Sequence, residues 1–228
     1  WLANLVWAAD QDERIAGVFG RHMAYPEANP FTARELEIHF LGFNNFPVVS
    51  LDDPHRYAVD EGYRQMLHFF SNNNALIRRT IWEKSPFPDV DFAEDQIWAQ
   101  TIIEAGWFKA YAGDAVVFHS HDYSIFERLL RSFDESNALY RLFGYRLCPN
   151  LGALVKKWAA LTVRDLCFAC ASGAWRKTPT FVARAPLDNF MRLLGHYLAM
   201  RGNRLQPMLK QKLSLDHRML TGLVKGKK

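Results

Sequence analysis

The sequence is poor in cysteine, and it has no long uncharged hydrophobic run. Three cysteines among 228 residues are too few for a disulfide scaffold, and an odd number in a cysteine-poor chain indicates a reducing compartment. The most hydrophobic stretch, residues 158–175, carries Arg164 and Asp165 near its middle, so we predict no transmembrane helix. With only 13 glycines and 10 prolines, the chain is neither collagen-like nor of low complexity.

Hydrophobic residues, in contrast, make up 49% of the chain, which is enough to bury a core. The net charge of +4 is unevenly distributed. Residues 1–125 contain 9 Lys and Arg against 18 Asp and Glu, whereas residues 126–228 contain 19 against 6. A basic half is typical of proteins that bind nucleic acid or an anionic membrane, and also of proteins whose surface charge serves only solubility. Its basic residues are scattered among Leu, Phe, Trp and Met without an RNA-binding pattern, so we predict no nucleic-acid partner.

Helical and strand patterns alternate in the first 120 residues and become almost entirely helical afterwards. We expect helices over 1–12, 32–40, 94–105, 124–144, 150–175 and 187–200, strands over 15–20 and 68–71, a hairpin over 109–118 with its turn at Gly113-Asp114, and a strand or short helix over 75–82. Thr32 is the expected cap of its helix. Residues 42–62 are expected to be irregular, and Pro179 and Pro186 to interrupt the last helical region. The predicted class is α/β, a partial Rossmann-like sheet followed by a mostly helical extension.

Three polar segments in the acidic half are candidates for a functional site. Residues 72–74 are successive asparagines after an apolar run, and they either form a turn or offer donors and acceptors to a ligand. Glu94 and Asp95 lie in the first turn of a predicted helix. Carboxylates at this position either take part in a reaction or stabilise the helix through its dipole. His119 and His121 follow an apolar strand. That position faces the ligand crevice of open α/β sheets, although a strand-end histidine is often only a hydrogen-bonded structural residue.

The order of five short segments resembles the second half of a family 2, GT-A-type glycosyltransferase of the rhamnosyltransferase-like branch. The segments are WLANLV (1–6), GVFGR (17–21), FSNNNA (70–75), FAEDQ (92–96) and HSHDYS (119–124). The resemblance implies that residues 1–135 are the acceptor-side half of a GT-A domain and that residues 136–228 are a helical, basic C-terminal extension. It also implies that the Asp-x-Asp metal motif of such enzymes lies just upstream of Trp1. Asp89-Val90-Asp91 resembles that motif but is out of place, and we interpret it as a loop before the catalytic helix.

The resemblance also implies roles for individual residues. Asp95 matches the general base that takes the proton of the acceptor hydroxyl in an inverting transfer, and Glu94 would support it. His119 matches a ligand of a divalent Mg²⁺ or Mn²⁺ beside the leaving diphosphate, with His121 as the second choice. The residues expected to contact donor or acceptor are Asn73, Asn74, His121, Arg128 and Arg131. For the two arginines, whose guanidinium groups suit phosphate oxygens, a solvated helix face is the alternative.

The implied function is transfer of a sugar, such as rhamnose, from a nucleotide-sugar to a polysaccharide or lipid-linked glycan. The expected place is the cytoplasm, with peripheral attachment to the inner face of the membrane as an option. The basic amphipathic helix over 187–200 either lies on an anionic leaflet or packs on the catalytic core. Two alternatives stay open: a non-catalytic GT-A-like binding module or membrane-surface interaction domain, and a hydrolytic metalloenzyme that uses His119, His121 and Asp95. We expect the isolated fragment to be inactive.

Overall fold

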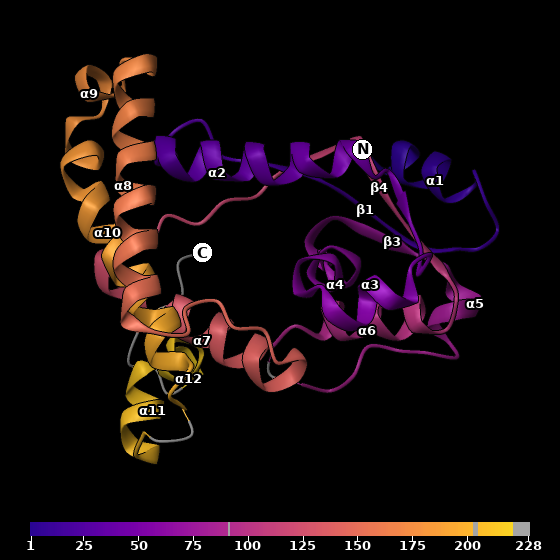
Figure 1. Ribbon diagram of the computed structural model, residues 1–228. Coiled ribbons are helices and arrows are strands. Elements are labelled where there is room, and N and C mark those ends of the chain that lie inside the picture. The colour runs from indigo at the N-terminus through magenta and orange to yellow at the C-terminus, as the bar shows by residue number, and fades with distance from the viewer. Residues whose placement is uncertain (91, 203–204, 221–228) are drawn as a thin grey trace. The chain divides into compact units, whose positions relative to one another are not determined.

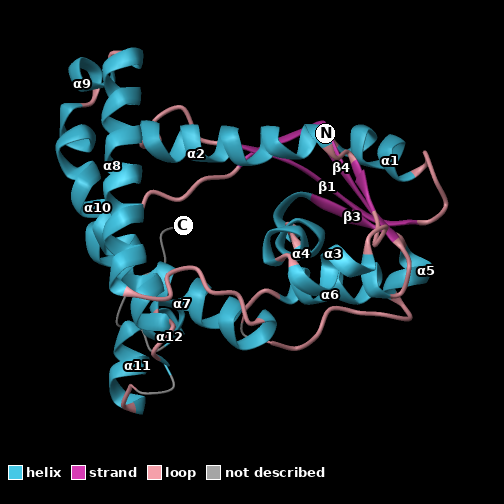
Figure 2. Ribbon diagram, viewed as in Figure 1, coloured by secondary structure: helices cyan, strands magenta, loops and turns pink. Residues whose placement is uncertain are grey.

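The chain forms two compact units, Trp1–His121 and Asp122–Lys228 (Figure 1). The computed structural model describes residues 1–90, 92–202 and 205–220. Strands lie in the first unit, and the described part of the second unit consists of helices and loops (Figure 2). The predicted α/β class with a helical extension is therefore confirmed. The domain division at residue 135 stays a prediction, and that residue lies within a helix of the second unit.

The first unit is built on a four-stranded mixed sheet. Its elements are α1 (Leu2–Ala9), β1 (Ile15–Met23), α2 (Pro30–Leu41), η1 (Gly42–Asn45), β2 (Val48–Val49), α3 (Pro54–Val59), α4 (Glu61–His68), η2 (Asn72–Asn74), β3 (Ala75–Ile77), α5 (Arg79–Trp82), α6 (Glu94–Glu104) and β4 (Phe108–Phe118). The strand order is β2-β4-β1-β3. The central strands β1 and β4 are parallel, and each outer strand is antiparallel to its neighbour. The carboxyl ends of β1 and β4 therefore meet at one edge of the sheet.

Both faces of this sheet are covered by apolar side chains. On one face, Phe19 is the centre of an aromatic cluster, with its ring 5.1 to 5.8 Å from the rings of Phe43, Phe69, Phe70 and Tyr111. The opposite face packs against the apolar side of α1. Successive residues of a strand point to opposite faces, so the two central strands are buried from both sides. This buried pair of strands fixes the position of the polar residues that follow it.

The predicted hairpin over 109–118 is wrong, because β4 continues as a single strand with a bulge. Residues 113–115 have no partner on β1. Ala115 is fully buried, so its carbonyl oxygen needs another hydrogen-bond donor. The side-chain amide of Asn74 donates to the carbonyl oxygen of Ala115 at 2.7 Å and to that of Arg21 at 3.3 Å. The side chain of Asn74 thus replaces the ladder partner of Ala115, and the side-chain amide of Asn4 donates to the carbonyl oxygen of Asp114 at 2.7 Å.

Gly20 lies against this bulge, and replacing it tests the tight contact. An added Cβ would lie 2.3 Å from the carbonyl oxygen of Ala115 and 2.3 Å from Nδ2 of Asn74. We expect Gly20→Ala to lower the free energy of unfolding by about 1–3 kcal/mol, because backbone and a buried amide must move. Gly42→Ala is the matched control, since its Cβ would meet nothing within 4 Å. Urea unfolding measures both, and equal stability of the two variants would contradict the packing described.

Helices α3 and α4 occupy much of the region predicted to be irregular, residues 42–62, and α4 ends at the first residue of the predicted strand, 68–71. The predictions of irregular chain over 42–62 and of a strand over 68–71 are therefore wrong. Each of the two helices begins at an aspartate. The carboxylates of Asp53 and Asp60 accept a hydrogen bond from the backbone N–H three residues on, at 2.8 and 3.1 Å. These are N-caps, so the aspartates that suggested irregular chain mark helix starts instead.

The second unit contains the helices α7 (Ile125–Phe143), α8 (Leu151–Ser172), α9 (Ala174–Lys177), α10 (Pro179–Ala199), α11 (Pro207–Leu213) and α12 (Leu215–Leu220). Helix α10 packs against α7 and α8. It runs continuously through Pro186, so the predicted break before residue 187 is wrong. Helix α2 also differs from expectation, because its N-cap is the side chain of Asn29 and not Thr32. Among the described residues, no helix combines the length and hydropathy needed to cross a membrane.

Candidate functional site

Helix α6 carries the predicted acidic pair and begins in an unusual way. Glu94 and Asp95 occupy its first turn, and its N-cap, Ala93, has a left-handed backbone with φ of 61°. In the described part of the chain, no other non-glycine residue has a positive φ. This conformation costs an alanine about 1–2 kcal/mol. Strain that the surrounding structure maintains at one residue is a feature of functional sites, and here it sets the direction in which α6 starts.

The carboxylate of Asp95 is half-buried and is held by backbone N–H groups. Its Oδ2 accepts a hydrogen bond from the backbone N–H of Asn72 at 3.2 Å, and its Oδ1 accepts one from Gln96 at 2.8 Å. Burial raises the pKa of Asp95 above its usual value, and the neighbouring charge of Glu94 adds to the rise, while the Asn72 N–H opposes it. A fixed carboxylate with a raised pKa is a better proton acceptor than a solvated one.

A histidine that the sequence analysis did not select, His22, joins this site from β1. Its side chain is buried, and its Nε2 lies 3.3 Å from Oγ of Ser71. Ser71 directly precedes Asn72, whose N–H holds Asp95. The end of β1 and the start of α6 therefore meet on the same two-residue segment. No sequence pattern marks His22, because its place beside β4 follows from the parallel pairing of β1 with that strand.

His119 directly follows β4, as predicted, and it lies beside His22. The ring centroids of His22 and His119 are 5.0 Å apart, and those of His119 and His121 are 4.8 Å apart. The backbone N–H of His119 donates to the carbonyl of Met23 at 2.8 Å. Burial lowers the pKa of His119, and the neighbouring His121 lowers it further. A series of contacts thus leads from His119 through His22 and the 71–72 segment to Asp95.

The buried position of His22 predicts an acidic titration. Burial, followed by the nearby His119 and His39, lowers the pKa of His22 from 6.5 to about 4. The unfolded chain therefore binds more protons between pH 6.5 and pH 4, and stability falls as the pH drops through this window. We expect an NMR titration of the ring, assigned with His22→Gln, to give a midpoint near pH 4. A midpoint near 6.5 would show that the ring is solvated.

The asparagine segment divides into an exposed and a buried part. Asn73, predicted to contact substrate, is exposed. Asn74, given the same role, is buried, and its amide donates to the carbonyls of the β4 bulge. Asn72 supplies the N–H that holds Asp95, a backbone contribution that no side-chain pattern signals. The substrate roles of Asn73 and Asn74 stay predictions.

The two predicted phosphate-binding arginines belong to the second unit, on the first turns of α7. The guanidinium of Arg128 lies over the ring of Tyr123, 5.3 Å from its centroid. Arg131 forms an ion pair with Asp216 at 3.5 Å, with both side chains partly exposed. Burial raises the pKa of Tyr123, and the two arginines oppose that rise. Within their own unit both residues therefore have structural contacts, and their phosphate role stays a prediction.

The described residues do not by themselves complete a metal centre. No three His, Cys, Asp or Glu side chains among them gather closely enough to hold a metal ion. His119 stays a predicted single ligand, which would need partners from outside this set. Asp91, in the segment that resembles a metal motif, lies outside the described residues.

The sequence is similar to two curated glycosyltransferases. No protein-family model matches it. It is 29% identical over 199 residues to the O-antigen chain rhamnosyltransferase RfbN of Salmonella typhimurium, covering 86% of this chain and 58% of that protein. It is 28% identical over 189 residues to the O-antigen chain rhamnosyltransferase WbaN of Salmonella anatum, covering 82% of this chain and 55% of that protein. The chain thus resembles O-antigen rhamnosyltransferases over most of its own length, and it spans somewhat more than half the length of each.

Proposed function

We propose that this chain is the acceptor-side part of an inverting glycosyltransferase of family 2, with a GT-A-type domain. It would transfer a sugar, such as rhamnose, from a nucleotide-sugar donor to a growing O-antigen or another lipid-linked glycan. The similarity to two rhamnosyltransferases supports the reaction class. The observation that carries the catalytic assignment is the Asp95 carboxylate, fixed by two backbone N–H groups at the start of α6.

In this proposal Asp95 is the general base. The acceptor hydroxyl oxygen attacks the anomeric carbon while Asp95 takes the hydroxyl proton, and the bond to the nucleoside diphosphate breaks on the opposite face of the sugar. One such displacement inverts the anomeric configuration. The raised pKa of Asp95 favours proton uptake, and its backbone hydrogen bonds hold the carboxylate in one orientation. Glu94, its neighbour in the first turn, would help to bind the acceptor.

A divalent cation belongs to the proposal only as a further expectation. When bound, Mg²⁺ or Mn²⁺ would neutralise the charge of the leaving diphosphate. His119 would be one ligand, because it follows β4 at the edge of the sheet where β1 also ends. The described residues do not supply a complete ligand set. Attachment to an anionic membrane surface, at the cytoplasmic face, likewise stays a prediction.

The stereochemistry of the product tests this function. The full-length protein from the native gene is incubated with a nucleotide-activated rhamnose and a lipid-linked O-antigen acceptor. We expect release of nucleoside diphosphate in step with a new glycosidic bond, whose anomeric configuration by NMR is opposite to that of the donor. A product with retained configuration would contradict the single-displacement mechanism. Release of free sugar without glycoside would favour a hydrolase.

A further inference from the structure

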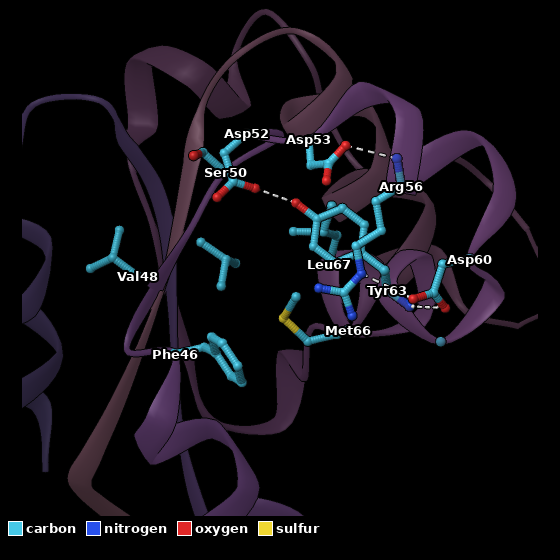
Figure 3. A pocket seen from close by; sticks show the side chains of 12 residues that line it. Phe46, Val48, Ser50, Asp52, Asp53, Arg56, Asp60, Tyr63, Met66 and Leu67 are labelled. Atoms are coloured by element: carbon cyan, nitrogen blue, oxygen red, sulfur yellow. Dashed lines mark hydrogen bonds and ion pairs between the residues drawn. The ribbon is translucent and has the colours of Figure 1, made fainter.

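A recess lies in the first unit beside the edge strand β2. This edge pocket has a volume of about 450 Å³ and is lined by residues of β2, of the loop after it, and of α3 and α4 (Figure 3). Its apolar part is formed by Phe46, Val48 and Met66. The ring of Phe46 and the side chain of Val48 are 54% and 45% exposed. An aromatic ring open to water beside a recess is available to a ligand.

The lining of the edge pocket includes neither His119 nor Asp95. Val48 pairs with Ala110, close to the start of β4. His119, in contrast, follows the last residue of the same strand. The neighbouring strand β1 covers this distance in five residues, from Val18, the partner of Ala110, to Met23, the partner of Phe118, which at about 3.3 Å per residue is roughly 17 Å. The edge pocket therefore lies near the opposite end of β4 from His119, and neither Asp95 nor the two residues whose N–H groups hold it lines the pocket.

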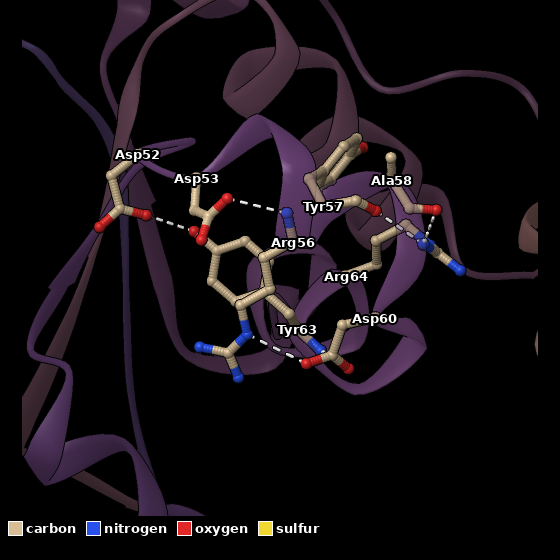
Figure 4. Close-up of polar contacts among 8 residues, drawn as sticks. All are labelled: Asp52, Asp53, Arg56, Tyr57, Ala58, Asp60, Tyr63 and Arg64. Atoms are coloured by element: carbon tan, nitrogen blue, oxygen red, sulfur yellow. Dashed lines mark hydrogen bonds and ion pairs between the residues drawn. The ribbon is translucent and has the colours of Figure 1, made fainter.

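Figure 4 shows the hydrogen bonds that the polar side chains of the edge pocket make within the protein. Oδ1 of Asp52 accepts from the hydroxyl of Tyr63, and Oδ1 of Asp53 accepts from the backbone N–H of Arg56 at 2.8 Å. The Nε of Arg56 donates to Asp60 at 3.0 Å, and its guanidinium lies 4.6 Å from the centroid of the Tyr63 ring. These contacts fix three side chains at the rim. They use one oxygen of Asp52, one of Asp53 and one nitrogen of Arg56, which leaves the second carboxylate oxygens and both Nη groups to a ligand.

The charge of the edge pocket narrows the class of ligand. Three carboxylates face one guanidinium, those of Asp52, Asp53 and Asp60 against Arg56, so the lining is net negative and repels phosphates and other anions. A nucleoside diphosphate is therefore disfavoured. The described carboxylates do not gather as a metal site either. A neutral ligand with many hydroxyl groups matches both the acceptors and the donors, since each hydroxyl both donates and accepts.

We propose that the edge pocket binds a neutral saccharide unit. Hydroxyl groups of the sugar would donate to the free oxygens of Asp52 and Asp53 and accept from the Nη groups of Arg56. The C–H face of the sugar would lie on the ring of Phe46. The assignment of this saccharide to the glycan acceptor rests on the proposed function. Because Asp95 does not line the edge pocket, the pocket would hold a part of the glycan other than the end that is extended.

Titration calorimetry of the full-length protein with methyl glycosides of rhamnose, mannose and galactose tests this proposal. We expect saturable millimolar binding of at least one glycoside. Phe46→Ala removes the stacking ring, and Asp53→Asn removes a carboxylate while keeping an N-cap. Each is expected to weaken the binding at least five-fold. Ile38→Ala, at a side chain with 53% exposure in α2, is the matched control and should leave affinity unchanged.

Two further outcomes separate this site from the catalytic proposal. Asp95→Asn should leave glycoside affinity unchanged, so loss of transfer and loss of binding report on different residues. Binding weakened by Asp95→Asn but not by Phe46→Ala would overturn the edge pocket assignment. Absence of saturable glycoside binding would also overturn it, as would binding of spermidine in place of every glycoside, which would identify a cation site.

Discussion

Asp95→Asn is expected to lower the rate of sugar transfer by about 10³-fold while donor affinity stays within two-fold of the wild type. The substitution is nearly isosteric, and the amide oxygen still accepts a hydrogen bond from the N–H of Asn72. What is lost is the basic oxygen, and a positioned general base contributes roughly 10²–10⁴ to rate. Steady-state assays of the full-length enzyme give kcat and KM, and donor titration gives the affinity.

The matched control for this prediction is Asp89→Asn. Asp89 undergoes the same chemical change six positions earlier, in the exposed loop before α6. We expect a rate within two-fold of the wild type, because this aspartate is interpreted as part of a loop and not of a metal motif. A large loss in Asp89→Asn together with an active Asp95→Asn would reverse the two assignments.

Lys109→Met is expected to lower the free energy of unfolding by about 3 kcal/mol. The Lys109 side chain is almost fully buried, and its Nζ donates to the carbonyl oxygens of Met66 at 3.0 Å and Leu67 at 2.6 Å, and also to that of Phe69. These carbonyls lie at the end of α4, where a cation complements the helix dipole. Each carbonyl left buried without a donor costs about 1–3 kcal/mol, and release of the desolvated ammonium offsets part of the sum.

Urea unfolding followed by circular dichroism measures this loss. Lys84→Met is the control, since Lys84 is exposed and a change within about 0.5 kcal/mol is expected there. Equal stability of Lys109→Met and the wild type would show that the carbonyls are reached by water.

The same lysine predicts a dependence of stability on pH. Burial lowers the pKa of Lys109 from 10.5 to about 7. The unfolded chain therefore binds more protons than the folded chain between pH 7 and pH 10.5, so this group makes stability rise with pH across that window. We expect Lys109→Met to lose this rise. If the stability of the wild type and that of Lys109→Met change with pH in the same way across this window, the lowered pKa is contradicted.

Local signals in the sequence are sufficient to predict an element where one apolar helix face or one capping residue determines it. The apolar spacing within residues 94–105 predicts α6, and Ser124 with Glu127 forms the capping box that starts α7. The same kind of signal exists at Asp53 and Asp60, which cap α3 and α4. The density of Asn, Asp and Pro around them nevertheless favours a prediction of irregular chain. At these two helix starts the capping aspartates decide the structure, and the surrounding polar composition does not.

Long-range pairing decides the elements that the sequence did not predict. The Gly113-Asp114 pair is compatible with both a hairpin turn and a bulge, and the amide of Asn74 stabilises the bulge from 41 positions away. Residues 69–71 read as a strand because of their aromatic rings. Those rings instead pack around Phe19 from irregular chain. Pro186 breaks the local helical pattern, yet packing against neighbouring helices carries α10 through it.

The residues of the candidate site also divide into those with a local sequence signal and those that depend on long-range packing. Its acidic pair and His119 were selected from the sequence, since they stand at a helix start and a strand end. His22 was missed because a single histidine in an apolar strand gives no pattern of its own. The contribution of Asn72 was missed because it is a backbone N–H. The edge pocket was missed because its lining comes from β2, α3 and α4, within a region predicted to be irregular.

Single-turnover transfer by the full-length enzyme tests the central claim most directly. Donor is bound to saturation in the wild type and in Asp95→Asn, an acceptor is added, and formation of the glycosidic bond is followed in time. The account predicts equal donor occupancy and a rate of bond formation about 10³-fold lower in Asp95→Asn. Bond formation at the wild-type rate with the donor site equally occupied would show that Asp95 is not the base.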